Sequence, residues 1–357
     1  MNVRQFASLA LIFLFLGTIL FWNPAVAEEV VGQEENINLY LYSENGVGKL
    51  HTRETGGHGD AESVNIPVGS SYFFALNFSL QDNLEAKSYR TDVGFHIHLY
   101  ANSANFNTGS LNIYVRDGTT MTGGELLATG SMDVPSVIQG DNEERVDVFW
   151  EENYGPTHQF DFEHYIVLEL ENDGENAVNL ELDTGKDGDS PSRLIVTTNP
   201  VTDIEIITES YNLETPNLDD LIITDNFQPN LPLDLSKVFV SAQALNAFGT
   251  YDITEFKVEV FDSDDNELFE EYVEINEPDD NSGTNGFDEL EWNYNTLDSF
   301  GELDKGIYSI RVSAIDQQGN EFFVDKSIQM DAYGIYLSTP DTQQSVAVGG
   351  DVTYQML

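Results

Sequence analysis

The chain has 357 residues, 63 Asp and Glu against 14 Lys and Arg, a formal net charge of −49, and no cysteine. Such dense negative charge excludes nucleic acid and anionic membrane surfaces as partners, because both would be repelled. The lack of cysteine excludes disulfides, thiol catalysis and cysteine-based metal sites. Hydrophobic residues make up 40% of the chain, which is enough for packed cores, so this is not a disordered acidic tail.

Residues 1–27 have the parts of an export signal. Arg4 supplies a short basic region, residues 6–22 are almost wholly apolar, and residues 25–27 (Ala-Val-Ala) form a small-x-small cleavage site. An uncleaved anchor is the alternative, but a helix over the apolar run spans only about 25 Å, short of the ~30 Å hydrocarbon core. We therefore expect a secreted or cell-surface protein, with no membrane insertion after cleavage unless an anchor lies beyond Leu357.

Residues 28–199 contain short segments in which apolar and polar residues alternate, separated by Gly, Asn and Asp turns. In residues 92–100, Phe95 and Ile97 point to one face while His96, His98 and Tyr100 point to the other. The same alternation occurs in residues 37–42, 111–116, 146–150, 165–171 and 179–183, and residues 71–80 are a further predicted strand. Short strands without an amphipathic helix predict an all-β fold, here an antiparallel β-sandwich whose length favours a jelly roll over an immunoglobulin domain.

Asn199-Pro200 is a turn signal between two apolar runs, and we place a domain boundary there. The linker is short, which predicts two domains held close together. Residues 200–331 should form an immunoglobulin-like or fibronectin-like sandwich, with residues 277–289 as an acidic loop. Its clearest strands are residues 238–245, 255–261, 268–275, 306–315 and 321–329.

Residues 332–357 begin a further strand pair and then stop. A strand at the end of a chain with nothing after it has no core of its own. We expect the start of a truncated third β-sandwich; an added edge strand on the second sandwich is the alternative.

Two passages resemble known modules. Residues 241–253 (SAQALNAFGTYDI), followed by a strand and an acidic hairpin, resemble the sandwich modules of large exported proteins of marine planktonic archaea. Residues 333–354, with a late Val-Gly-Gly-Asp-Val-Thr-Tyr, are similar to the opening of the CARDB and NEW3-type adhesion-like domains of archaeal and bacterial surface proteins. The resemblance covers about a third of the chain and implies a secreted or surface multi-sandwich protein. It carries over no ligand residue.

The sequence contains no Gly-x-Ser-x-Gly elbow, His-Glu-x-x-His motif, phosphate loop or dinucleotide fingerprint. The paired carboxylates of a glycosidase have no fixed spacing, and among 63 acidic residues such a pair can be found by chance. We therefore expect a protein that is not an enzyme.

His96 and His98 share one face of a predicted strand, about 7 Å apart along it at ~3.3 Å per residue. They form a candidate metal pair, with His158 or His164 as a third ligand. The alternative is two surface histidines on the solvent face of a half-buried strand.

The loop of residues 262–267 is a candidate site for calcium, the only cofactor we consider. Asp262, Asp264 and Asn266 offer oxygen ligands at alternate positions, which suits a hard cation. The alternative is a solvated hairpin turn, because Asp and Asn favour turns. The acidic loops at residues 277–281 and 183–189 leave the same two interpretations open.

Asn77-Phe78-Ser79 is an Asn-x-Ser glycosylation acceptor. It falls inside the strand predicted over residues 71–80, which weakens the case for a glycan at Asn77.

Four aromatic residues lie out of phase with the predicted core: Tyr100, Tyr114, Phe149 and Tyr154. A flat aromatic row on a jelly roll can hold sugar rings by apolar stacking with polar rims. The alternative is that both faces of the sheet are covered by protein.

Together these features predict a secreted or cell-surface, non-catalytic protein that acts in adhesion, scaffolding or binding. Its partners would be extracellular polysaccharide or other surface proteins. The alternative is a carbohydrate-binding accessory region of a larger secreted glycoside hydrolase or protease.

Overall fold

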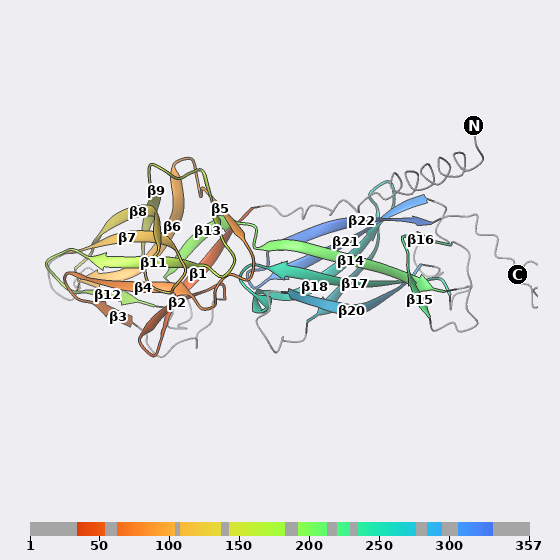
Figure 1. The fold of residues 1–357 in the computed structure, drawn as a ribbon, viewed down its shortest axis with the longest axis horizontal. Helices are drawn as coiled ribbons and strands as arrows, with labels where there is room; N and C mark the ends of the chain where they lie inside the picture. Colours follow the sequence, from red (N-terminus) through yellow and green to blue (C-terminus); the bar gives the residue numbers. More distant parts are fainter. Residues whose placement is uncertain are drawn as a thin grey trace, which may run out of the picture.

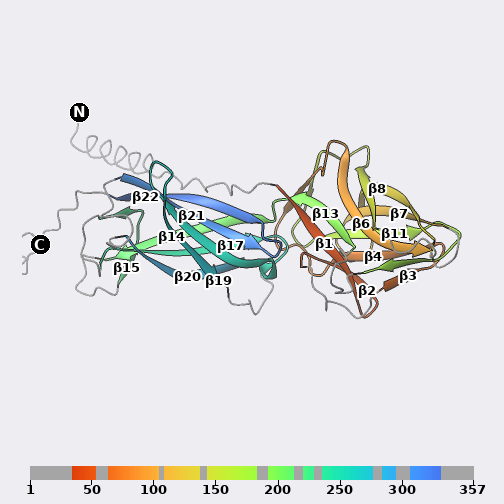
Figure 2. The ribbon, with the colours of Figure 1, turned by 180° about the vertical axis from the view of Figure 1, so that it is seen from behind.

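The computed structural model describes residues 34–53, 63–103, 108–136, 143–182, 192–212, 220–228, 235–275, 284–294 and 306–330. The protein is all-β: the described residues form strands β1 to β22 and a 3-10 turn at Thr250–Asp252. No helix among them is long and apolar enough to cross a membrane. The expected export signal and the start of a third sandwich lie outside the described residues. Figures 1 and 2 show two units lying end to end.

The N-terminal unit (residues 34–198) is one 13-stranded sheet that closes on itself. Its strands follow the order β10-β5-β13-β1-β2-β4-β11-β7-β8-β9-β6-β12-β3, and a further pairing of β13 with β6 completes the ring. The expected sandwich layers are therefore joined by hydrogen bonds at both edges, through β2 and β9. The strands are β1 (Glu35–Glu44), β2 (Val47–His51), β3 (Ser63–Ile66), β4 (Ser70–Leu76), β5 (Leu84–Lys87), β6 (Val93–Ser103), β7 (Gly109–Gly118), β8 (Glu125–Val134), β9 (Glu143–Trp150), β10 (Thr157–Phe160), β11 (Tyr165–Asn172), β12 (Val178–Glu181) and β13 (Arg193–Thr198).

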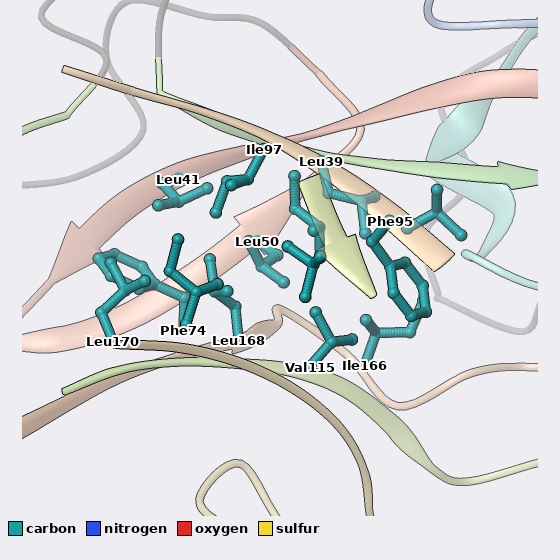
Figure 3. Close-up of a cluster of buried hydrophobic side chains, with 14 of the residues drawn as sticks. Leu39, Leu41, Leu50, Phe74, Phe95, Ile97, Val115, Ile166, Leu168 and Leu170 are labelled. Atoms are coloured by element: carbon teal, nitrogen blue, oxygen red, sulfur yellow. The ribbon is translucent and has the colours of Figure 1, made fainter. Parts of the chain in front are cut away.

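The first hydrophobic core lies between the two layers of this ring (Figure 3). Leu39 and Ile97 from one layer face Phe74 and Leu168 from the other, and all four are fully buried. Burying one such side chain contributes roughly 1.5–3 kcal/mol. The apolar residues of the alternating segments supply this core, as their period of two predicted.

The C-terminal unit (residues 201–330) is a sandwich of two sheets around a second core. The 4-stranded sheet has the order β15-β14-β17-β20, and the 5-stranded sheet has the order β16-β22-β21-β18-β19. The strands are β14 (Val201–Tyr211), β15 (Leu221–Ile223), β16 (Asn226–Phe227), β17 (Lys237–Asn246), β18 (Ile253–Phe261), β19 (Glu267–Glu274), β20 (Thr284–Asn293), β21 (Gly306–Asp316) and β22 (Glu321–Met330).

The expected acidic loop at residues 277–289 is wrong in its second half, because β20 begins at Thr284. Leu290 and Trp292 are buried in the second core, while Glu289 is exposed and Glu291 lies on the same outward side. The acidic residues therefore occupy the solvent face of a strand, and their density conceals the alternation.

Gln318, in the turn between β21 and β22, joins the two units. Its Oε1 accepts hydrogen bonds from the backbone N (3.0 Å) and Nδ2 (2.9 Å) of Asn38. Its Nε2 donates to the backbone oxygens of Asn38 (2.8 Å) and Thr52 (3.0 Å). Ala247 and Phe248 also pack into the first core. The short connection between β13 and β14 thus joins two units in direct contact.

Candidate functional site

A cleft of about 580 Å³ opens at the junction of the two units. Its lining comes from β1, from Arg53 just after β2, and from the β21–β22 turn. These residues are Asn36, Asn38, Tyr40, Arg53, Gln317, Gln318 and Asn320. Segments that are 280 positions apart in the sequence, at Asn38 and Gln318, thus meet at one site.

Three amide side chains of this cleft are each held by one of their two polar atoms. Asn36 Oδ1 accepts a hydrogen bond from Thr197 Oγ1 at 2.7 Å. Gln317 Nε2 donates to the backbone oxygen of Tyr251 at 2.8 Å, and Asn320 Nδ2 donates to Asp316 Oδ2 at 2.7 Å. Among the described residues, nothing pairs with the other polar atom of these three amides. The cleft therefore presents one NH₂ group and two carbonyl oxygens on side chains that are already positioned.

Arg53 is the one charged residue in the described lining of the cleft. Its side chain is exposed, and no carboxylate within the described ranges pairs with the guanidinium. In a chain with 63 acidic residues and 14 Lys and Arg, an arginine without an acidic partner is free to contact a ligand. Its planar group carries five N–H donors.

No sequence pattern predicts this cleft, because the residues that line it carry no motif. Gln317, Gln318 and Asn320 are recognisable only as a turn, and Asn36 only as the end of an acidic segment. No local periodicity connects the two.

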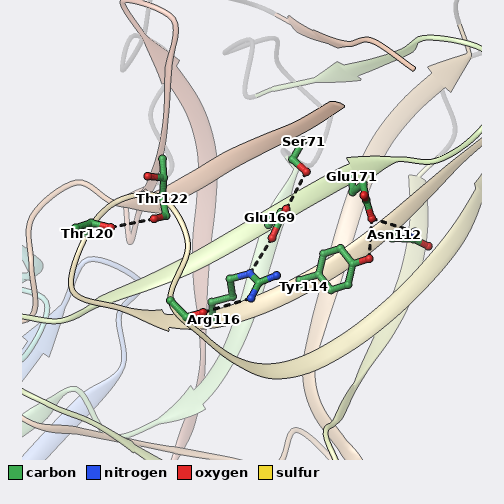
Figure 4. A network of polar contacts seen from close by, with 9 residues as sticks. Ser71, Asn112, Tyr114, Arg116, Thr120, Thr122, Glu169 and Glu171 are labelled. Atoms are coloured by element: carbon green, nitrogen blue, oxygen red, sulfur yellow. Dashed lines mark hydrogen bonds and ion pairs between the residues drawn. The ribbon is translucent and has the colours of Figure 1, made fainter. Parts of the chain in front are cut away.

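A second candidate is the outer face of β4, β11 and β7, where a polar network surrounds Tyr114 (Figure 4). The Tyr114 hydroxyl donates to Glu171 Oε2 at 2.7 Å, and this hydrogen bond is the main cause that raises the pKa of Tyr114 to about 12. Arg116 Nε donates to Glu169 Oε2 at 2.7 Å, and its guanidinium carbon lies 5.4 Å from the Tyr114 ring centroid. The network fixes the ring on a partly exposed face.

Tyr114 and Phe149 belong to one cross-strand row of the sheet. Tyr114 on β7 is opposite Thr129 on β8, which is opposite Phe149 on β9. Two strand spacings separate the aromatic residues by about 10 Å. The Phe149 side chain is 50% exposed.

The other two predicted aromatic residues lie away from this row. Tyr100 is opposite Glu143, six residues along β9 from Phe149. The Tyr154 hydroxyl donates to Glu125, and its ring packs against the first core and edge-on to His158. The structure therefore aligns Tyr114 with Phe149 and does not place all four residues in one row.

His96 and His98 share one face of β6, and their ring centroids are 5.0 Å apart. Both are buried, with exposed fractions of 8% and 7%, so the alternative of two solvent-facing histidines is wrong. His96 Nδ1 lies 2.8 Å from Asp147 Oδ1, and Arg193 Nη2 donates to His98 Nδ1 at 2.9 Å. Protein groups thus contact the Nδ1 atom of each ring.

His158 and His164, the expected third ligands, flank Asp117 instead. His158 Nε2 lies 2.9 Å from Asp117 Oδ2, and His164 Nδ1 lies 2.6 Å from Asp117 Oδ1. The structure does not bring them together with the pair on β6, and the metal site stays a prediction.

The turn between β18 and β19 is closed by its own hydrogen bonds. Asp262 Oδ1 accepts from the backbone N of Asp264 and of Asn266, each at 2.9 Å. Asn266 Nδ2 donates to Asp262 Oδ2 at 2.9 Å, and these hydrogen bonds lower the pKa of Asp262. This arrangement is that of a hairpin turn; calcium binding there stays a prediction. The loops at residues 277–281 and 183–189 lie outside the described residues.

Within the described ranges, one carboxylate cluster has a spacing that suits a metal ion: Glu259, Glu267 and Glu270. Lys257 Nζ, however, lies 2.8 Å from Glu259 Oε1 and 3.2 Å from Glu270 Oε2. The ammonium group therefore already neutralises part of this cluster.

Asn77 lies just after β4, which ends at Leu76. The expectation that this acceptor lies inside a strand is wrong, because Asn77 is a half-buried loop residue. A position inside a strand therefore no longer argues against a glycan at Asn77.

No protein-family model and no curated protein matches this chain. Among solved structures, it is similar to a β-glucuronidase of Bacteroides uniformis, with 9% identity, a TM-score of 0.21, and a match that covers 72% of this chain and 25% of that chain. It is also similar to a β-glucuronidase of Parabacteroides merdae, with 10% identity, a TM-score of 0.23, and a match that covers 75% of this chain and 36% of that chain. A third similar structure is a β-glucuronidase of Ruminococcus gnavus, with 9% identity, a TM-score of 0.19, and a match that covers 86% of this chain and 46% of that chain. The chain thus spans a quarter to just under half of these proteins. Similarity at this level establishes neither a shared fold nor a shared activity.

Proposed function

We propose that this chain is an exported, non-catalytic binding protein of the cell surface or its surroundings, and that it holds a saccharide in the junction cleft. The observation that carries the proposal is the set of half-engaged amides in that cleft. A sugar hydroxyl both donates and accepts hydrogen bonds, and these amides offer a donor at Asn36 and acceptors at Gln317 and Asn320.

The size and rigidity of the cleft support the same proposal. Its volume of about 580 Å³ falls within the ~300–1,000 Å³ typical of small-molecule sites. Gln318 fixes the β21–β22 turn through three hydrogen bonds to Asn38 of β1 and one to Thr52, which follows β2. Both walls of the cleft are therefore in place before a ligand arrives. Such preorganisation lowers the entropic cost of binding.

The test is retention of the full chain on a panel of soluble and insoluble glycans. Asn36→Ala and Gln317→Ala should each weaken binding about 5- to 10-fold, the loss of one hydrogen bond at about 1 kcal/mol. Gln329→Ala removes an exposed amide from β22 outside the cleft and is the matched control. Retention that both cleft variants leave unchanged would contradict the cleft as the site.

A second candidate function is that of a carbohydrate-binding accessory region of a larger secreted hydrolase. The row of Tyr114 and Phe149 favours it, because two aromatic residues in one cross-strand row, two strand spacings (about 10 Å) apart along the backbone, suit stacking against a polysaccharide chain. Tyr114→Ala and Phe149→Ala should then abolish retention on insoluble polysaccharide, while Asn36→Ala should not. Tyr114→Phe retains the ring and should retain binding.

Adhesion through other surface proteins remains the proposal if no glycan is retained. A pull-down with the intact chain as bait, compared with the Asn36→Ala variant, tests whether the cleft takes part.

A further inference from the structure

One sequence motif has no part in the cleft or in the aromatic row. Asn77-Phe78-Ser79 is the only Asn-x-Ser/Thr triplet of the chain, and its middle residue is not proline. Such a triplet is an acceptor for N-linked glycans in exported proteins, where it lies on a surface loop. Whether the motif can serve as an acceptor therefore depends on where the fold places it and on what its side chains already contact.

The triplet is a short surface connection that the first core holds at both ends. β4 ends at Leu76, which is 2% exposed, and Leu80 on the other side of the triplet is fully buried. Both leucines belong to the first core. Between them the chain is outside any strand, Asn77 and Ser79 are half-buried, and Phe78 is 43% exposed. The fold therefore presents the motif at the surface in a defined position.

The two side chains that define the motif take no part in the hydrogen bonding of the fold. Within the described ranges, neither the Asn77 amide nor the Ser79 hydroxyl has a hydrogen-bond partner. Asn172 shows the contrast, because it is fully buried and its Nδ2 donates to two backbone oxygens. A sugar on Asn77 Nδ2 would therefore displace no hydrogen bond that the structure describes.

The alternative is that Asn77 and Ser79 only shape the turn after β4. Other groups already do so. The backbone N of Asn77 donates to the Leu50 backbone oxygen at 3.0 Å, and Gln81 Nε2 donates to the Ser79 backbone oxygen at 2.8 Å. Neither contact needs the amide of residue 77 or the hydroxyl of residue 79. A structural role thus leaves both groups of the motif unexplained.

The triplet also lies beside the contact between the two units. The Phe78 ring centroid is 5.9 Å from that of Tyr251 in the C-terminal unit. The backbone N of Gln81 donates to the Ala247 backbone oxygen at 2.8 Å, again across the junction. A group attached to the residue before Phe78 is therefore placed at the rim of the junction.

We propose that Asn77 carries an N-linked glycan at the rim of the junction. An oligosaccharyltransferase joins Asn77 Nδ2 to the anomeric carbon of an oligosaccharide carried on a polyprenyl phosphate or diphosphate. The bond from that carbon to the lipid phosphate breaks, the phosphate keeps the electron pair, and Nδ2 loses one proton. This modification rests on the export that is part of the proposed function, and not on saccharide binding in the cleft.

The test is tandem mass spectrometry of the full chain isolated from the cells that naturally produce it. Trypsin releases residues 54–87 as one peptide, because no Lys or Arg lies between Arg53 and Lys87. This peptide should carry sugar, and its fragment ions should place the sugar on Asn77. Asn65 and Asn83 lie in the same peptide without the motif, so they are internal controls and should be unmodified.

Three variants of the full chain, secreted from yeast, assign the modification to the motif. Asn77→Gln keeps an amide but removes the acceptor, and Ser79→Ala removes the hydroxyl; both should lose the glycan entirely. Ser79→Thr retains a hydroxyl and should retain the glycan. Because the two wild-type side chains have no described hydrogen bonds, the circular dichroism spectra of all three variants should match that of the unmodified protein.

The outcomes separate the glycan from the export on which it rests. An unmodified Asn77 in natural protein that has lost residues 1–27 overturns the glycan and leaves export standing. Natural protein that stays inside the cell with residues 1–27 intact and no sugar overturns both. A sugar that persists in Ser79→Ala also overturns the proposal, because the motif then does not direct its attachment.

Discussion

Gln318 pairs with Asn38 as a strand residue pairs with its neighbour: its amide accepts from the backbone N and donates to the backbone oxygen of the same residue, at 3.0 and 2.8 Å. β2 pairs with β1 only from Tyr40 onward. The polar backbone of Asn38 is therefore left open by β2, and a side chain of the C-terminal unit completes the ladder. Buried backbone groups need such partners.

Gln318→Ala should separate the unfolding of the two units. It leaves the backbone groups of Asn38 and Thr52 without their partner, which costs about 2 kcal/mol. Differential scanning calorimetry should show two transitions or a broadened one. Gln317→Ala removes a single hydrogen bond, to the Tyr251 backbone oxygen, and should have a smaller effect. Identical thermograms for the two variants would contradict the role of Gln318.

The free energy of unfolding should fall as the pH rises from 4 to above 7. Asp252 ends the 3-10 turn after β17 and is buried. Burial, followed by the charge of Asp316, raises its pKa from the ordinary 3.8 to about 7 in the folded protein. Between these values the folded state binds a proton that the unfolded state lacks, so stability is highest below the lower value and is lost as the pH passes 7. The upper limit of this loss is roughly 4 kcal/mol, at 1.36 kcal/mol per pH unit. Urea titrations at pH 5.5, 7.0 and 8.5 measure it, and Asp252→Asn should remove most of the slope.

Tyr114→Phe should cost about 1 kcal/mol of stability, because it removes a hydrogen bond to the Glu171 carboxylate on a partly exposed face. The same variant removes a tyrosine whose pKa is raised to about 12. An ultraviolet titration of tyrosine ionisation should therefore lose one of the steps at the highest pH. Tyr272→Phe, at an exposed ring, is the control. A variant as stable as the unmodified protein would show that the network in Figure 4 contributes no net stability.

Calcium should raise the melting temperature of the unmodified protein no more than sodium chloride of equal ionic strength. The reason is that Lys257 already neutralises part of the cluster of Glu259, Glu267 and Glu270, and that the Asp262 carboxylate is hydrogen-bonded within its turn. Lys257→Ala leaves the nearly buried Glu259 without its cation, so it should destabilise the protein by about 3 kcal/mol.

Calcium should then restore part of that loss, because the three carboxylates are spaced for an ion. A large calcium effect on the unmodified protein would instead locate a site elsewhere in the chain and support the calcium interpretation of the acidic loops.

The alternating segments predicted the all-β class and most strand positions, because a period of two records which side chains face the core. The same rule identified Tyr114 and Phe149 as out of phase with that core. The rule does not work for β20, where acidic residues fill the outward positions. It also left the burial of His96 and His98 unpredicted, because a period of two reports which residues share a face and not what covers the second face.

The sequence by itself determined composition, charge, the absence of cysteine and the local period of the strands. Only the tertiary structure decided which residues meet at the junction, as Gln318 meets Asn38. This contact joins positions 280 residues apart, and no periodicity or motif spans such a distance. The pKa of Asp252 follows the same logic. The sequence shows that residue 252 is an acid, but its burial and its closeness to the charge of Asp316 arise only in the folded protein.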